Sequence, residues 1–169
     1  MASPPTLVSV DEYLRTSFSD GDREYVDGHI VERNLGEKDH SKTQGELIYF
    51  FRANRGNLGT YAFPEQRVQV KPARFRVPDV CVYIGKEPEE QVFRTPPFLV
   101  IEILSKDDRP GDLEDKVSDY LEFSVPYVWV IDPAGKRGYI CTREGKQEAT
   151  EGVLETDNPS IKLDLRVLF

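Results

Sequence analysis

The sequence predicts an α/β domain of the α+β kind, in which a central β-sheet is flanked by helices. Two observations predict this class. Apolar runs of strand length recur along the chain, at 77–84, 98–104 and 127–131. Two longer segments, 39–54 and 112–123, carry apolar residues at helical spacing instead. We expect all 169 residues to form a single domain, 1–169, with residues 1–6 as a loose tail.

The composition is typical of a globular protein rather than a disordered or membrane-spanning one. Hydrophobic residues make up 38% and charged residues 31% of the chain. No apolar run approaches the ~20 residues that span a bilayer, and the first residues lack the pattern of a secretory signal. Cys81 and Cys141 lie in strand-like runs and are expected to be buried without forming a disulfide. We therefore expect a cytoplasmic protein with no membrane partner.

The charge is acidic overall but unevenly distributed. A net charge of -8 has the wrong sign for a protein that coats nucleic acid non-specifically. Between residues 52 and 76, however, six bases face one acid, whereas eleven acids face four bases between residues 87 and 122. An acidic site beside a basic stripe suits a metal-dependent nuclease, although chance produces such patterns as well.

The N-terminal third begins with a short helix and a hairpin. Residues 9–16 have the spacing of a capping box, with Ser9 as the cap and Glu12 three positions later. A turn is expected at 20–22. Asp27-Gly28 is a strong two-residue hairpin signal between strands at 23–26 and 29–33, and Glu24 lies in the first of these strands. A solvent-facing strand acid is the simplest interpretation of Glu24.

The next segments predict a helix and two strands. The helix at 39–54 can be capped by Asp39 or Ser41, and it carries His40 and Glu46. Residues 61–71 are strand-like, and a turn follows at 72–74. In the strand 77–84, the alternation of side chains puts Asp79, Cys81 and Tyr83 on one face.

Two carboxylates stand where apolar strands would prefer none. Asp79 lies among valines, and Glu102 lies between Ile101 and Ile103 in the run 98–104, which is otherwise apolar enough to be covered on both faces. Acids are rarely buried unless they are paired or bind a metal. Either the two acids lie at a strand edge that faces water, or they form a site.

The C-terminal half continues with a helix and further strands. In the helix 112–123, Leu113, Val117, Tyr120 and Leu121 form the apolar stripe, and Lys116 borders it. The strand 127–131 ends at a turn, after which 138–142 is expected to pair with it. One more strand is expected at 161–167.

These motifs together resemble the Uma-type family of restriction endonucleases, within the PD-(D/E)XK nuclease superfamily. The matching stretches are REYVDGHIVERN (23–34), His40, PDV with Asp79, EILS with Glu102, Asp112-x-x-x-Lys116-x-x-x-Tyr120, and VPYVWVIDP (125–133). The resemblance covers nearly the whole chain in family order. It implies a restriction-endonuclease-like fold with a central mixed sheet, and an endonuclease that cleaves DNA.

The resemblance also implies a cofactor and its ligands. Asp79, Glu102 and the backbone carbonyl of Ile103 would bind Mg²⁺, for which Mn²⁺ could substitute. The family carries a glutamate at the place of Glu24, near the site, and a histidine at the place of His40. An auxiliary acid on the first helix of many related enzymes makes Glu46 a further candidate.

The catalytic lysine departs from the superfamily pattern. In that pattern it follows the acid by two residues, where this chain has Leu104. Lys106 is the next position on the same face, whereas Lys116 matches a pattern in which the lysine has moved to the following helix, with Asp112 or Tyr120 steadying it. Alternatively, Asp112 and Lys116 form only an exposed i,i+4 ion pair. We expect Lys116 to complete the site.

Partners follow from the same interpretation. Arg67, Lys71, Arg74 and Arg76 just precede the strand of Asp79 and are expected to contact the DNA backbone. A homodimer is expected, because cleavage of both strands by a small domain usually takes two sites. The alternative from another class is a weakly active or inactive nuclease-fold module for nucleic-acid binding or assembly, which Leu104 and the overall acidity favour.

Overall fold

The computed structural model describes residues 6–19, 21–34 and 36–169. Most of the predicted tail at 1–6, and Asp20 of the predicted turn, lie outside the described residues. The helices are α1 (Val10–Arg15), α2 (Lys38–Ala53), α3 (Arg55–Leu58) and α4 (Pro110–Glu122), with 3₁₀ turns at Thr150–Gly152 and Leu165–Val167. No helix within the described ranges is long and apolar enough to cross a membrane.

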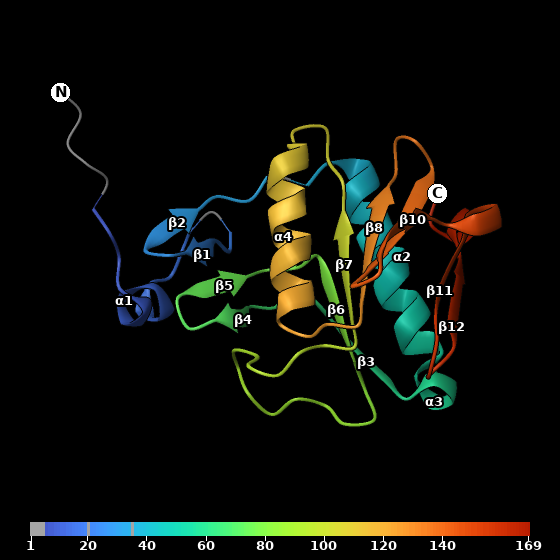
Figure 1. Ribbon diagram of the computed structural model, residues 1–169, viewed down its shortest axis with the longest axis horizontal. Coiled ribbons are helices and arrows are strands. Elements are labelled where there is room, and N and C mark those ends of the chain that lie inside the picture. The colour runs from blue at the N-terminus through green and yellow to red at the C-terminus, as the bar shows by residue number, and fades with distance from the viewer. Residues whose placement is uncertain (1–5, 20, 35) are drawn as a thin grey trace.

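A six-stranded mixed sheet forms the centre of the fold (Figure 1). Its spatial order is β10 (Gly145–Glu148), β9 (Arg137–Thr142), β8 (Tyr127–Asp132), β7 (Leu99–Ile103), β6 (Val80–Ile84) and β3 (Thr60–Pro64). Only the β7–β8 pair is parallel, and helix α4 makes the crossover between these two strands. The predicted α/β class with a mixed central sheet flanked by helices is therefore confirmed.

Helices cover both faces of this sheet because successive apolar side chains of its strands point to opposite faces. On one face, Leu47 and Phe51 of α2 pack on Val80, Val82 and Ile101, together with the hairpin of β11 (Val153–Thr156) and β12 (Ile161–Asp164). On the other face, Tyr120 of α4 packs with Cys81 and Val100. The predicted alternation along 77–84 is confirmed, and both cysteines are buried and free, as expected.

A second, smaller sheet lies beside the first and holds the hairpin that carries Glu24. Its order is β2 (His29–Val31), β1 (Glu24–Val26), β5 (Arg74–Arg76) and β4 (Val68–Lys71). Tyr13 of α1 stacks on Tyr25 at 5.1 Å between ring centroids and also contacts Phe75, which ties α1 to this sheet. The predicted cap of α1 is confirmed, since Ser9 Oγ accepts the amide of Glu12 at 3.2 Å.

Several predicted boundaries were wrong. The segment 61–71 is not one strand, because the chain turns at Glu65, with φ of 49°, and passes from β3 into β4 of the other sheet. The N-cap of α2 is Glu37 without a side-chain cap bond, rather than Asp39 or Ser41. The last strand ends at Asp164, whose side chain caps the following 3₁₀ turn.

A buried charge cluster joins the small sheet to α4. Asp119 of α4 is 2% exposed, and its carboxylate accepts hydrogen bonds from Arg74 at 2.8 Å and from Arg76 at 2.8 and 2.7 Å. Lys71 lies 3.3 Å from the same carboxylate. Burial raises the pKa of Asp119, but the bonds from Arg74 and Arg76 outweigh it and hold the pKa below its usual range.

Asp119→Asn should therefore destabilise the fold by about 3–5 kcal/mol at pH 7, because it leaves Arg74 and Arg76 without their shared anion. Since the folded pKa is depressed, this stabilisation is present above the unfolded value of about 3.9 and is lost as the pH falls through the folded value. Urea unfolding at pH 7 and pH 3 should show the difference from the unmodified protein shrinking in acid. A loss below about 1 kcal/mol at pH 7, no greater than that of the exposed control Asp157→Asn, would contradict the prediction.

Candidate active site

The two strand carboxylates lie side by side at one end of the central sheet. Asp79 immediately precedes β6, and Glu102 lies in β7. The antiparallel register pairs Val80 with Ile101, so the next position places Asp79 opposite Glu102. Both side chains line one small cavity of about 40 Å³, and the two residues are only 4% and 5% exposed. The two carboxylates therefore lie on the same face of the sheet.

Asp79 is held from several sides. The amide of Ile103 donates to Oδ2 at 2.7 Å, Arg33 Nη2 donates to Oδ1 at 2.9 Å, and His40 Nε2 lies 3.3 Å from Oδ1. Gln44 of α2 donates to the backbone carbonyl of Asp79 at 2.9 Å. Burial raises the pKa of Asp79, but His40, the Ile103 amide and Arg33 outweigh it, and the pKa lies below its usual range. Asp79 is thus an ionised carboxylate in a fixed orientation at neutral pH.

Glu102 has a different environment from Asp79. Tyr120 donates its hydroxyl to Oε1 at 2.7 Å, and Lys116 Nζ lies 3.6 Å from Oε2. Burial raises the pKa of Glu102 to about 7, with Lys116 opposing the shift and the charges of Asp79 and Glu24 adding to it. A further cation in the cavity would stabilise the ionised form of this carboxyl group.

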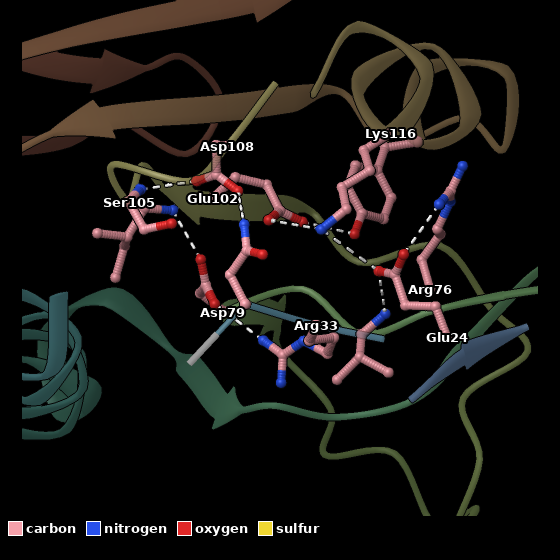
Figure 2. Close-up of polar contacts among 12 residues, drawn as sticks. Glu24, Arg33, Arg76, Asp79, Glu102, Ser105, Asp108 and Lys116 are labelled. Atoms are coloured by element: carbon pink, nitrogen blue, oxygen red, sulfur yellow. Dashed lines mark hydrogen bonds and ion pairs between the residues drawn. The ribbon is translucent and has the colours of Figure 1, made fainter. Parts of the chain in front are cut away.

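Lys116 projects from α4 toward Glu102 and Glu24 (Figure 2). Its Nζ lies 3.6 Å from Glu102 and 3.6 Å from Glu24 Oε1. Glu24 is 1% exposed and is itself fixed, since Arg76 donates to Oε2 at 2.9 Å and the amide of Val77 donates to Oε1 at 3.1 Å. Burial lowers the pKa of Lys116, but the charges of Glu102 and Glu24 outweigh it and raise the pKa. The raised pKa favours the cationic form of Lys116.

The secondary candidates lie at different distances from this cluster. His40 lines the small cavity, and its pKa is raised chiefly by the hydrogen bond with Asp79. Asp112 lines a larger cleft of about 600 Å³, which Lys116 also lines. Lys106 is 68% exposed and pairs with Glu37, outside the small cavity. Glu46 lies on α2 but does not line the cavity, whereas Gln44 of the same helix contacts Asp79.

The basic stretch is largely engaged by the protein's own acids. Arg76 is buried against Glu24 and Asp119, and Arg74 pairs with Asp119 and Asp27. Lys71 is more accessible, with 38% of its side chain exposed, and pairs with Asp119 and Glu122. The guanidinium of Arg67 lies 5.9 Å from the centre of the Tyr13 ring. Part of the local positive charge is therefore neutralised within the fold.

Sequence reasoning did not single out four polar residues that line the cavity, namely Arg33, Asn34, Ser105 and Asp108. Arg33 and Asn34 follow β2, and Asp108 lies in the loop after β7. Asn34 Nδ2 donates to Asp108 Oδ1 at 2.8 Å. Asp108 Oδ2 accepts a hydrogen bond from the amide of Ser105 at 2.6 Å, and Figure 2 labels these two residues. The motif REYVDGHIVERN contains Arg33 and Asn34, but Glu24 was the only residue of this motif that the sequence marked as a site candidate. The partner of Asn34 is Asp108, 74 residues further along the chain, so no local pattern could reveal the contact.

The donor set of the cavity fits a hard divalent cation. Two adjacent buried carboxylates concentrate negative charge, and oxygen ligands of this kind suit Mg²⁺. No group of three or more His, Cys, Asp or Glu side chains in the described ranges is arranged to hold a metal. An ion at this place would therefore take Asp79 and Glu102 together with backbone or water oxygens, and Ile103 lines the cavity beside them.

Comparison with known proteins agrees with the fold and with the family that the motifs resemble. A crystal structure from Anabaena variabilis ATCC 29413, titled as a putative nuclease belonging to DUF820, superposes with a TM-score of 0.82 at 23% identity, over 96% of this chain and 97% of that one. No curated protein matches the chain. The Uma2 family, described as "Putative restriction endonuclease", matches residues 10–168. The chain belongs to this family.

Proposed function

We propose that the protein is a divalent-metal-dependent endonuclease that hydrolyses phosphodiester bonds in DNA. The observation that carries the proposal is the single small cavity in which Asp79 and Glu102 meet, with Lys116 beside Glu102. Family membership supports a nuclease, and the carboxylate pair supports Mg²⁺ as the ion, with Mn²⁺ as a substitute.

In this proposal, the residues around the cavity have different roles in hydrolysis. Asp79, Glu102 and the carbonyl of Ile103 would hold the metal ion, which would activate a water molecule and neutralise charge on the phosphate. Lys116 would stabilise the negative charge that develops on the phosphate. It would take the role of the superfamily's lysine, whose usual position is occupied by Leu104 in this chain. Tyr120 fixes Glu102, and Glu24 fixes Lys116. The hydrogen bond from His40 helps to lower the pKa of Asp79.

Contacts to the DNA backbone by the basic stretch remain a prediction. The Lys71 side chain is 38% exposed and that of Arg74 21%, and Arg76 is the least accessible of the four. Replacing one phosphate contact should flatten the salt dependence of DNA binding by about one unit of slope. An unchanged slope for the Arg67 and Lys71 variants would locate the DNA elsewhere.

Homodimerisation and a cytoplasmic location are also part of the proposal. Two copies would supply two active sites for a duplex, and they would offer more surface for DNA than one acidic copy with a net charge of -8. The free thiols of Cys81 and Cys141 suit a reducing compartment. Light scattering with and without DNA should give the mass of a dimer, and a monomer under both conditions would remove this part of the proposal.

A plasmid-nicking assay tests the proposed function. Supercoiled DNA should be converted to nicked and linear forms in Mg²⁺ or Mn²⁺ but not in EDTA, because the carboxylate pair needs the ion to act on phosphate. DNA that is bound but left intact under every metal condition would instead favour the alternative of an inactive nucleic-acid-binding module.

A further inference from the structure

Arg33 stands where the small cavity meets the larger cleft. It follows β2 and lines both spaces, as do Asn34, Asp108 and Lys116, so the cavity of the carboxylates opens into the cleft along these side chains. Its Nη2 lies 2.9 Å from Asp79 Oδ1, and its Nη1 lies 3.5 Å from Glu65. The side chain is only 16% exposed. A guanidinium is thus held, largely buried, at the mouth of the proposed metal site.

Arg33 and Lys116 approach the carboxylate pair from different elements. Lys116 comes from α4 and lies beside Glu102, whereas Arg33 comes from the segment after the β1–β2 hairpin and lies beside Asp79. Figure 2 shows the two cations on different sides of the cluster. A phosphate that reached an ion held by Asp79 and Glu102 through the cleft would therefore pass between two positive side chains.

Orienting Asp79 does not by itself require Arg33. The Ile103 amide already fixes Oδ2 and His40 already contacts Oδ1. A guanidinium also presents five N–H donors in a planar fork, which suits two oxygens of one phosphate better than a single carboxylate oxygen. The Arg33 fork makes a single hydrogen bond of 2.9 Å to Asp79 and a longer ion pair to Glu65. The fork therefore has more N–H donors than these two contacts use, and the side chain lines both the cavity and the cleft.

We propose that Arg33 is a catalytic residue that binds the scissile phosphate opposite Lys116, and that it competes with the metal ion for Asp79 Oδ1. This inference rests on the proposed function and assigns a second phosphate-binding cation to the same site. Competition follows from geometry, because a metal ligated by Oδ1 would share that atom with a guanidinium 2.9 Å away. Removing the positive charge should then favour metal binding while impairing the chemical step.

Arg33→Gln tests both parts. At saturating Mg²⁺ and DNA, we expect cleavage to slow by about 10²–10³-fold, the range typical of one lost charge-stabilising donor. In the DNA-free protein, Mn²⁺ titration followed by electron paramagnetic resonance should show an affinity that is roughly 3–30-fold tighter, because the positive charge that competes for Asp79 Oδ1 has been removed. An unchanged affinity would overturn the competition. Arg33→Lys, which keeps the positive charge, should recover part of the rate.

The matched control is Arg94→Gln, which makes the same change of charge at an arginine that is 53% exposed and pairs with Glu90. It should alter neither measurement. Weaker Mn²⁺ binding by Arg33→Gln, with the rate restored by excess metal, would show that Arg33 only orients Asp79 and would overturn the inference. Normal cleavage by Arg33→Gln would overturn this inference and leave the proposed function standing. A wild-type protein that binds no Mn²⁺ would overturn the proposed function together with it.

Discussion

Asp79→Ala is expected to abolish both divalent metal binding and DNA cleavage. Asp79 is the ionised member of the carboxylate pair, and its loss leaves Glu102, whose pKa burial raises to about 7, to hold the ion alone. The loss of an ionised ligand, with its orienting bond from the Ile103 amide, should therefore remove the site rather than weaken it. Mn²⁺ titration by electron paramagnetic resonance and plasmid nicking measure the two effects.

Two variants control for this result. Asp79→Asn keeps the volume but removes the charge, so it should also fail to bind metal, and circular dichroism should show that it remains folded. Asp132→Ala removes a carboxylate at the end of the neighbouring strand β8, outside the small cavity, and should keep metal binding. An Asp79→Ala protein that binds Mn²⁺ with normal affinity would contradict the assignment of the ligands.

Lys116→Ala is expected to separate metal binding from catalysis. Lysine is not a ligand, so metal affinity should remain largely intact, while the cleavage rate should fall by about 10²–10⁴-fold, as for a lost charge-stabilising group. That loss corresponds to about 2.7–5.5 kcal/mol of transition-state stabilisation. The physical reason is that Lys116, 3.6 Å from both Glu102 and Glu24, is the cation that α4 brings to the cavity.

Single-turnover cleavage at saturating metal measures this effect directly. Lys116→Met should be tested alongside, because it fills more of the space and limits collapse around the buried acids. Lys106→Ala is the matched control, since that side chain is exposed and pairs with Glu37. Normal cleavage by Lys116→Ala, with slow cleavage by Lys106→Ala, would return the catalytic role to Lys106.

The two carboxylates of the site could be predicted from the sequence, because they stand out against the apolar residues of their strands. Asp79 and Glu102 interrupt apolar strands, and burial of such acids needs a reason, so both could be singled out without a structure. That they meet depends on the β6–β7 register, which no local pattern encodes. Lys116 borders the apolar stripe of its helix, and this position predicted that its side chain reaches toward the sheet. Its contact with Glu24 could not be predicted, because Glu24 belongs to the β1–β2 hairpin of the smaller sheet.

Long-range pairing explains what the sequence could not reveal. The stretch from Arg67 to Arg76 is basic by composition. Its partners Asp119 and Asp27 lie more than forty residues away in the sequence, so the neutralisation of its charge could not be predicted. Arg33 and Asp108 carry no periodic signal, and only the folded loops bring them to the cavity. Strand β10 was missed because its four residues are all exposed and carry no apolar side chain, and only its pairing with β9 makes it a strand.

The most direct test of the central claim is a crystal structure of the protein soaked in Mn²⁺, with anomalous diffraction measured to locate the ion. We predict a peak between the carboxylates of Asp79 and Glu102, about 2.0–2.3 Å from their oxygens, beside the carbonyl of Ile103 and absent from Asp79→Ala crystals. No peak in this cavity at a Mn²⁺ concentration that supports DNA cleavage, or a peak only elsewhere, would contradict a metal-dependent active site at this place.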